Sequence, residues 1–354
     1  MMSVIKPGKK SHKVLAMASN RRYGLNTEAG ETMRPQPFSL VGDGAGSIFK
    51  IFTTAAAMEM GMGINTQLEV PPRFQAKGMG SGGAKGCPKE TWCVVNAGNY
   101  RSPMNVTDAL ATSPNTAFAK LISMVGVPRA VDMAVRLGLR SYADPGSARD
   151  YDPDSNESLA DFIKRQNIGS FTLGPFELNA LELSNVAATL ASGGVWCPPN
   201  PIDKLVDRDG NEVAVNAEPC DQVVPEGLAN TLANALSKDS QAGARRRVLP
   251  RRRLEPADVR QDRHHRSAPV VGLRRIHQPV RGRQLHLRRL QFTVGSVFLP
   301  AAALRQWGSL RRQRTGPHVV YRDEAHRHQI RRGETAPVDP HYVEGGPARG
   351  YPAW

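Results

Sequence analysis

The sequence predicts an α+β fold, because helical patterns fill the middle of its first 244 residues and strand patterns lie towards both ends of that region. A chain of 354 residues, 40% of them hydrophobic, is long enough to bury a sizeable core in one or two domains. The sequence contains no internal repeat.

The first expected elements each follow from a local signal. Residues 14–17 form a short apolar run after a basic segment that contains Pro-Gly, which predicts a strand after a turn. Residues 20–46 are polar and rich in glycine, so we expect a loop. From residue 47 the apolar, alanine-rich pattern predicts a buried helix that ends at Gly61. Residues 65–102 contain many Gly, Pro and Lys without a clear period, and we expect an irregular surface region there.

The second half of this region predicts more helix. Residues 105–126 indicate two helical pieces that meet at Ser113-Pro114-Asn115, because proline ends one helix and can begin the next. We expect another amphipathic helix at 128–139, turns at 141–160 and a long apolar helix within 174–193. Residues 195–215 predict paired strands joined by an Asp-Gly turn.

The net charge of +15 arises at the end of the chain. Residues 245–354 contain 24 Arg, no Lys and 8 Asp plus Glu, a net charge of +16, whereas the residues before them have a net charge of −1. The same stretch holds eight of the nine histidines, while all 12 lysines and all four cysteines precede it. Such different residue usage requires a separate explanation for each part.

No membrane segment or targeting signal is expected in this chain. A membrane-spanning helix needs roughly 18 consecutive apolar residues. The longest apolar stretch of the tail, residues 294–304, is shorter and contains Pro300. The N-terminus has basic residues but no continuous apolar segment after them, so it does not have the pattern of a signal peptide.

Ser47 and Lys50 are the first candidates for catalysis. Their spacing puts a hydroxyl and an amine on one face of a helix, about one turn apart. An amine in an apolar setting loses its proton more readily and can then accept the serine proton during nucleophilic attack. The alternative is a capping serine beside a surface lysine, but the surrounding sequence Ile-Phe-Lys-Ile-Phe is too apolar for a well-solvated lysine.

Ser113 and Asn115 supply a second hydroxyl and an amide at the junction between two predicted helices. The hydroxyl could relay a proton between Lys50 and a leaving group, and the amide could bind a substrate carbonyl. Taken alone, Ser-Pro-Asn is most often a helix cap.

Three segments together point to a known family. GAGSIFKIFTTAAAMEMG, NVTDALATSPNTAFAKL and SFTLGPFELNALELSNVAATLASGGVW follow one another in this order. The region from about residue 10 to 241 resembles the transpeptidase domain of penicillin-binding proteins, specifically the bifunctional peptidoglycan synthases of high-GC Gram-positive bacteria. The resemblance implies a penicillin-binding-protein/serine β-lactamase-like fold, in which an antiparallel sheet lies against a helical region.

The same resemblance implies a D,D-transpeptidase that acts by serine acyl transfer on D-Ala-D-Ala stem peptides of peptidoglycan. Ser47 would be the acylated nucleophile, Lys50 its base, and Ser113 and Asn115 the second motif, with the Ser47 backbone N–H as half of the oxyanion hole. β-Lactam antibiotics would acylate the same serine, and no metal or organic cofactor would be needed. The family acts at the extracytoplasmic face of the cell membrane, and its glycosyltransferase domain and membrane anchor would lie upstream, so we expect a truncated N-terminus.

The four cysteines suit an oxidising exterior. Cys197 and Cys220 flank the predicted hairpin, while Cys87 and Cys93 lie close together in a glycine-rich loop. A zinc site is the alternative, but no histidine lies near them in the sequence. We expect two disulfides, with their exact pairing left open.

The family also needs a Lys-Thr-Gly strand beside the nucleophile, and this chain has no lysine after Lys238. Residues 254–267 can be encoded by codons that, read one nucleotide later, give WNLPMSGKTGTTE, which contains the missing motif. Permitted codons extend this agreement downstream, and residues 338–354 resemble the family's C-terminal segment directly. We therefore expect three segments: the N-terminal and helical part of the transpeptidase domain at 1–241, an out-of-frame segment at 242–337 that disrupts the C-terminal strands, and a family-like tail at 338–354.

Two other function classes stay open at this point. A β-lactam sensor or hydrolase of the same fold would share the first two motifs, but a hydrolase should need a deacylating base that the sequence does not identify. A basic nucleic-acid-binding protein would act through its arginine-rich tail, with a solvated disordered tail as the simpler version. We expect no specific nucleic-acid partner, and we expect the chain as written to be inactive.

Overall fold

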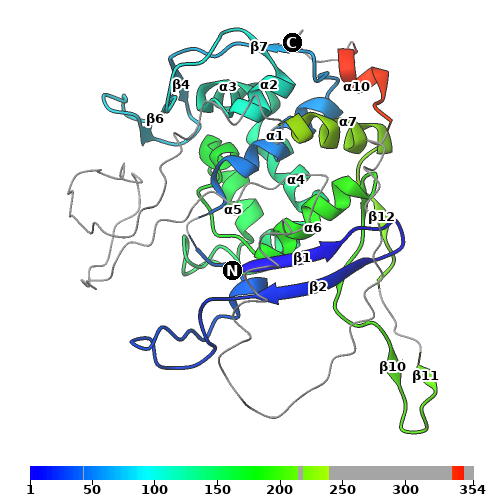
Figure 1. The fold of residues 1–354 in the computed structure, drawn as a ribbon. Coiled ribbons are helices and arrows are strands. Elements are labelled where there is room, and N and C mark those ends of the chain that lie inside the picture. Colours follow the sequence, from blue (N-terminus) through cyan, green and yellow to red (C-terminus); the bar gives the residue numbers. More distant parts are fainter. Residues whose placement is uncertain (43, 214–217, 239–336, 347–354) are drawn as a thin grey trace, which may run out of the picture.

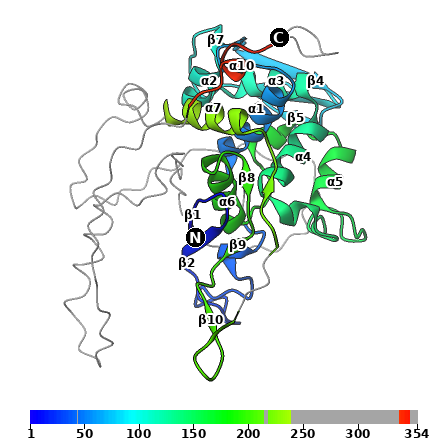
Figure 2. The ribbon, with the colours of Figure 1, turned by 90° about the vertical axis from the view of Figure 1, so that its right-hand side faces the viewer.

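A bundle of helices stands beside a small N-terminal sheet in the computed structural model (Figure 1). Helix α1 (Lys50–Glu59) runs through the bundle, and helix α6 (Ala180–Ala191) packs on the sheet (Figures 1 and 2). This mixture of helix and strand confirms the expected α+β class. The structure describes residues 1–42, 44–213, 218–238 and 337–346.

The N-terminal sheet begins with a hairpin that was only half expected. The strand predicted at residues 14–17 is part of β2 (His12–Ala18), and it pairs antiparallel with β1 (Met2–Lys6), which the sequence analysis missed. β9 (Pro199–Asn200) pairs in parallel with the start of β2. The out-of-frame segment proposed at 242–337 lies outside the described residues, apart from Pro337.

Helix α1 follows a tight turn and is buried almost all round. Residues Gly46–Phe49 form a 3-10 turn, η2, and α1 continues from it without a break. The helix is rich in alanine, so α3, α4 and α7 can pack closely against it. It ends near Gly61 as predicted, where the chain turns with a φ of 98° that glycine adopts easily.

The break predicted at Ser113-Pro114-Asn115 separates two helices. α2 (Val106–Thr112) ends at Ser113, and α3 (Asn115–Val125) starts directly after Pro114. α4 (Val127–Leu137) follows, with a proline in its first turn. These elements confirm the helices expected at 105–126 and 128–139.

Residues 65–102 contain more order than we expected, and this expectation was wrong. β4 (Arg73–Lys77) and β6 (Thr91–Val95) pair antiparallel, and β5 (Gly82–Gly83) joins β6 in parallel. β3 (Gln67–Leu68) pairs with β7 (Met104–Asn105). The strands are short and surrounded by Gly, Pro and Lys, so no hydrophobic period is long enough to reveal them.

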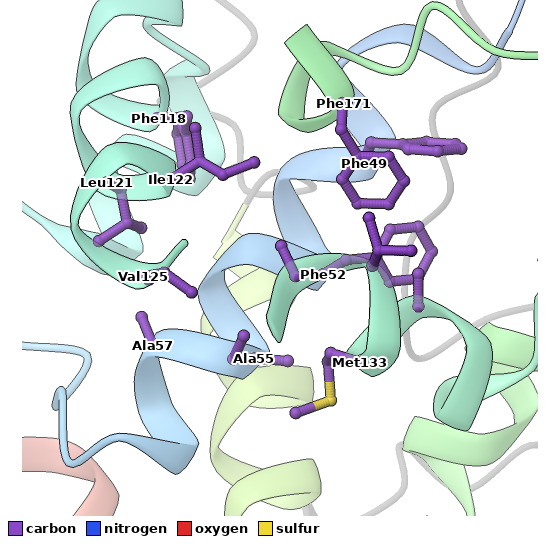
Figure 3. Packing of buried hydrophobic residues seen from close by; sticks show 14 of the residues in the cluster. Phe49, Phe52, Ala55, Ala57, Phe118, Leu121, Ile122, Val125, Met133 and Phe171 are labelled. Carbon is purple, nitrogen blue, oxygen red and sulfur yellow. The ribbon is translucent and has the colours of Figure 1, made fainter. Parts of the chain in front are cut away.

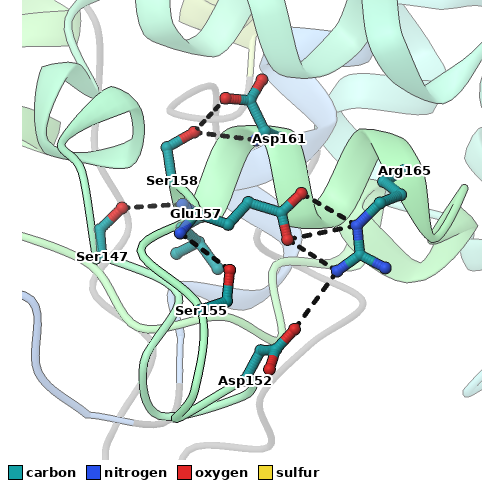
Figure 4. A network of polar contacts seen from close by, with 8 residues as sticks. Ser147, Asp152, Ser155, Glu157, Ser158, Asp161 and Arg165 are labelled. Atoms are coloured by element: carbon teal, nitrogen blue, oxygen red, sulfur yellow. Dashed lines mark hydrogen bonds and ion pairs between the residues drawn. The ribbon is translucent and has the colours of Figure 1, made fainter.

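A polar network closes the turn-rich region before helix α5 (Leu159–Arg165) (Figure 4). The Arg165 guanidinium donates to both carboxylate oxygens of Glu157, at 2.7 to 3.2 Å, and lies 3.5 Å from Asp152. Ser158 caps α5 by accepting from the backbone N–H of Asp161. The network therefore ties the acidic turns at 141–160 to the bundle.

Strands follow helix α6 as predicted. β10 (Leu205–Val206) and β11 (Glu212–Val213) pair across the Asp-Gly turn, which confirms the hairpin. β8 (Val195–Trp196) pairs with β12 (Asp221–Gln222), and helix α7 (Glu226–Ser237) then returns to the bundle.

The C-terminal segment packs against the same bundle (Figure 1). α10 (Pro340–Glu344) lies beside α7, and the backbone N–H groups of Ile64 and Asn65 donate to the carbonyls of Tyr342 and Val343 at 2.9 Å. A Cβ added at Gly63 would lie 2.3 Å from the Gly345 nitrogen, so this contact requires a glycine. The segment predicted to resemble the family again is thus fitted to the N-terminal part of the chain.

The core lies where α1, α3, α4 and the 3-10 turn η4 (Gly169–Leu173) meet (Figure 3). Phe49 packs edge-on against Phe52 and Phe171, with ring centroids 5.2 Å apart in each pair. All three rings are fully buried. This aromatic group holds the start of α1, and therefore the residues on its first turn, against the bundle.

Candidate active site

The turn that carries Ser47 is held by close backbone contacts. The N–H of Gly46 donates to the carbonyl of Gly174 at 3.1 Å. A Cβ at Gly44 would lie 2.0 Å from the Gly174 oxygen, and a Cβ at Gly174 would lie 2.4 Å from the Gly46 oxygen. Only glycines permit this approach, so Ser47 begins its helix from a fixed backbone position.

Ser47 and Lys50 face each other across the tight turn. In a 3-10 helix, side chains three positions apart are eclipsed, so the η2 turn brings the two side chains closer in line than an α-helix would. The Lys50 Nζ lies 3.2 Å from the Ser47 Oγ. Lys50 is 2% exposed, whereas Ser47 is half-buried and open to solvent. The prediction that this lysine is not a solvated surface residue is confirmed.

Ser113 and Asn115 complete the cluster around the amine. The Lys50 Nζ lies 2.8 Å from the Ser113 Oγ, 2.9 Å from the Ser113 carbonyl oxygen and 2.9 Å from the Asn115 Oδ1. It also lies 5.2 Å from the centre of the Phe118 ring. The structure therefore brings together the four residues selected from the sequence, from the junction between η2 and α1 and the junction between α2 and α3.

Ser113 reaches Lys50 because its backbone is left-handed. Its φ and ψ are 62° and 46°, which is uncommon for a residue other than Gly, Asn or Asp. This conformation turns both its hydroxyl and its carbonyl towards the same amine. Pro114 fills the cap position of α3 without a side-chain hydrogen bond. Ser113 is thus a partner of Lys50, which goes beyond the cap that its sequence alone would suggest.

The four oxygens around Lys50 differ in what they can do. The Ser113 carbonyl and the Asn115 Oδ1 can only accept hydrogen bonds, whereas the two serine hydroxyls can either accept or donate. Two amine hydrogens can satisfy the two obligate acceptors. The remaining position of the nitrogen then faces the two hydroxyls, where it can donate a hydrogen as a cation or accept one as a neutral amine. The same set of contacts can therefore hold the Lys50 side chain both as a neutral amine and as the cation that forms when it accepts a proton.

The end of β6 also touches this site, and sequence reasoning missed it. The Asn115 Nδ2 lies 3.5 Å from the Val95 carbonyl oxygen, and the backbone N–H of Thr116 donates to the Asn96 Oδ1 at 3.0 Å. Val95 and Asn96 lie about 20 residues before α3 in a region that we had expected to be irregular. No local pattern connects them to the Ser-Pro-Asn motif.

The cysteines pair within the two sequence regions that contain them. Cys87 is joined to Cys93, and Cys197 is joined to Cys220. The first disulfide joins β6 to the loop before it, and the second connects the residue after β8 to the residue before β12. Because Cys93 lies in β6, only this disulfide is on an element that reaches the candidate site.

Within the part of the chain that the structure describes, no three His, Cys, Asp or Glu side chains gather closely enough to hold a metal ion. His12, the histidine of the N-terminal sheet, lies between Asn185 of α6 and Ser192, the residue that follows this helix. Burial lowers the pKa of His12, and the Asn185 side chain partly opposes this shift. None of the helices in the described residues is long and apolar enough to cross a membrane.

Comparisons with known proteins find relatives for most of this chain. A family model described as the penicillin binding protein transpeptidase domain matches residues 5–251. Penicillin-binding protein 1A of Mycobacterium tuberculosis is 27% identical over 214 residues, which cover 58% of this chain and 23% of that protein. Peptidoglycan D,D-transpeptidase PbpA of Mycolicibacterium smegmatis is 27% identical over 220 residues, which cover 56% of this chain and 42% of that protein.

A solved structure shares the fold. Penicillin-binding protein A from M. tuberculosis, as its penicillin G acyl-enzyme complex, matches with a TM-score of 0.51 at 22% identity and covers 68% of this chain and 58% of that chain. The chain spans less than half the length of the two curated relatives.

Proposed function

Because the chain belongs to the transpeptidase family of penicillin-binding proteins, we propose that Ser47 is the nucleophile of a peptidoglycan D,D-transpeptidase site. Its Oγ would attack the carbonyl of the penultimate D-Ala of a stem peptide. The bond between that carbonyl and the terminal D-Ala nitrogen would break, and D-Ala would leave with the proton that Ser47 gave up. An amine of a neighbouring strand would then take the acyl group and restore the serine.

The position of the Lys50 amine between two hydroxyls carries this proposal. Neutral Lys50 takes the proton of Ser47, and Ser113, 2.8 Å from the same nitrogen, passes a proton to the leaving amine. The Asn115 Oδ1 and the Ser113 carbonyl hold the amine in place during both transfers. Asn115 also orients the substrate through its amide. The burial of Lys50 beneath half-buried Ser47 supports these roles, since a substrate can reach the hydroxyl while the amine stays shielded.

The substrates follow from this chemistry. We propose stem peptides ending in D-Ala-D-Ala as the natural donors and β-lactams as alternative acylating agents, with the site acting at the extracytoplasmic face of the membrane. The relative whose fold matches was solved as a penicillin G acyl-enzyme. The proposed reaction requires no metal or organic cofactor.

We further propose that the chain as written does not complete the reaction. The sequence contains no Lys-Thr-Gly, whose cation would bind the substrate carboxylate and whose following backbone would complete the oxyanion hole. The hypothesis that residues 242–337 are translated out of frame accounts for the missing motif. The fit of Gly345 against Gly63 supports a common reading frame for the two ends of the chain.

Labelling with a fluorescent penicillin tests both proposals. Two chains are compared: the chain as written, and one in which residues 242–337 are replaced by the translation of the adjacent frame. We expect label on the restored chain, lost in its Ser47→Ala variant, and no Ser47-dependent label on the chain as written. A restored chain that labels equally with and without Ser47 would refute the assigned nucleophile. Label on the chain as written that depends on Ser47 would refute its inactivity.

A further inference from the structure

Helix α3 begins without a cap from its own sequence. The first N–H groups of a helix have no partners within the helix, and a side chain just before the helix usually accepts one of them. Here the cap position is Pro114, which makes no side-chain hydrogen bond. The neighbouring hydroxyl of Ser113 points to Lys50 instead. The helix that carries Asn115 therefore needs its cap from elsewhere.

Asn96 supplies that cap from the end of strand β6, which lies beside α3. Its Oδ1 accepts from the backbone N–H of Thr116 at 3.0 Å, the position that a cap side chain normally serves. Its Nδ2 donates to the Thr116 Oγ1 at 2.8 Å and lies 3.3 Å from the Pro71 carbonyl. The Thr116 hydroxyl donates to the same carbonyl at 2.7 Å. Thr116 is fully buried and Asn96 is partly buried, so the Thr116 end of these bonds is shielded from water.

This cap lies next to the residues that surround the reactive amine. Val95 and Asn96 are consecutive on one side, and Asn115 and Thr116 are consecutive on the other. While Asn96 holds Thr116, the Val95 carbonyl lies 3.5 Å from the Asn115 Nδ2, and the Asn115 Oδ1 is left facing Lys50. The contacts form an unbroken path from β6 to the amine.

We propose that Asn96 is a positioning residue, which caps α3 from a distance so that Ser113 and Asn115 are both free to contact Lys50. The inference rests on the proposed function, because positioning these groups matters for catalysis only if they serve the reaction of Ser47. Asn96 itself does not touch the reacting atoms. Its effect reaches them through Thr116 and Asn115.

Nuclear magnetic resonance of the full chain tests this role without relying on acylation. The chain is labelled with 15N-asparagine and 13Cε-lysine, and the signals of Asn115 and Lys50 are assigned from Asn115→Asp and Lys50→Arg. Asn96→Ala removes the cap. Asn179→Ala is the matched control, because Asn179 caps α6 by accepting from the N–H groups of Leu181 and Glu182.

We expect Asn96→Ala to shift the side-chain amide signals of Asn115 and the Cε signal of Lys50, and Asn179→Ala to leave both at their wild-type positions. Unchanged signals in Asn96→Ala, or equal shifts in both variants, would overturn the proposal. If Asn96→Ala does not fold, Asn96→Leu is compared with Asn179→Leu. Leucine has nearly the shape of asparagine but no oxygen that can accept from the helix N–H, so only the first variant should shift the Asn115 signals. A shift in a chain whose Ser47 proves unreactive would leave the positioning intact and refute only the function.

Discussion

Raising the pH through neutrality is expected to destabilise the fold through one carboxyl group, that of Glu182 at the start of α6. Burial raises the pKa of Glu182 from its ordinary value of 4.5 to about 7, although both the backbone N–H and the hydroxyl of Ser141 donate to its oxygens at 2.8 and 2.6 Å. The charge of Asp144 adds to the increase, and that of Arg140 opposes it. Glu182 is therefore more easily protonated in the folded chain than in the unfolded chain.

The sign and size of the effect follow from this difference. Between pH 4.5 and 7 the folded chain binds more protons than the unfolded chain, so the free energy of unfolding falls as the pH rises. The stabilising contribution is present below about 4.5 and is lost as the pH passes about 7. From pH 5 to 8 the expected loss is about 2.5 kcal/mol, since one pKa unit corresponds to ~1.4 kcal/mol.

Urea unfolding of the wild type and of Glu182→Gln, each at pH 5 and pH 8, measures the contribution. Glutamine cannot ionise, so the variant should lack this loss. The two chains must be compared because His12 also contributes to the pH dependence. Burial lowers its pKa, so its contribution to the free energy of unfolding increases as the pH rises, opposite to that of Glu182. Glu212→Gln is the control, since Glu212 is an exposed residue of β11. If Glu182→Gln shows the same difference between the two pH values as the wild type, the assignment to Glu182 is wrong.

Two further predictions concern the covalent and backbone contacts that hold the fold. Replacing both members of a disulfide by alanine should cost about 2 kcal/mol for Cys87–Cys93 and about 3 kcal/mol for Cys197–Cys220, because the loops closed span 6 and 23 residues. Urea midpoints would measure both losses, and the reverse order would contradict the loop-length argument. Gly63→Ala should displace residues 339–346 and speed amide exchange of Ile64 and Asn65 roughly tenfold or more. Gly98→Ala is the control, since no atom lies within 4 Å of its added Cβ, and unchanged exchange in Gly63→Ala would rule out the expected clash.

Local signals were sufficient to predict the elements that carry the candidate site. Pro114 marks the break between α2 and α3, and Asp209-Gly210 marks the hairpin of β10 and β11. The apolar residues around Lys50 indicated that its amine is buried. Each of these signals lies within a few residues of the feature that it predicts. The catalytic roles of Ser47, Lys50, Ser113 and Asn115 stay predictions.

The features that the sequence did not reveal depend on contacts between distant residues. Asn96 is separated from Thr116 by 20 residues, and Asn65 from Glu344 by 279, so neither contact leaves a periodic pattern. β1 is a short strand in a segment whose basic residues and Pro-Gly predict only a turn and the absence of a signal peptide. β6 was hidden by the glycines, prolines and lysines around it. Tertiary contacts decide these cases, and a single sequence does not display them.

At Ser113 the backbone conformation and the candidate chemistry favour different residues. The left-handed backbone favours glycine, whereas the candidate chemistry needs a hydroxyl. Such a conformation costs about 1–2 kcal/mol for most residues and almost nothing for glycine. The backbone conformation alone would therefore favour glycine at this position, but glycine has no hydroxyl to present to Lys50. The serine that stands there therefore keeps a hydroxyl 2.8 Å from the Lys50 amine at the cost of an unfavourable backbone conformation, which is the arrangement that the proposed proton transfer would need.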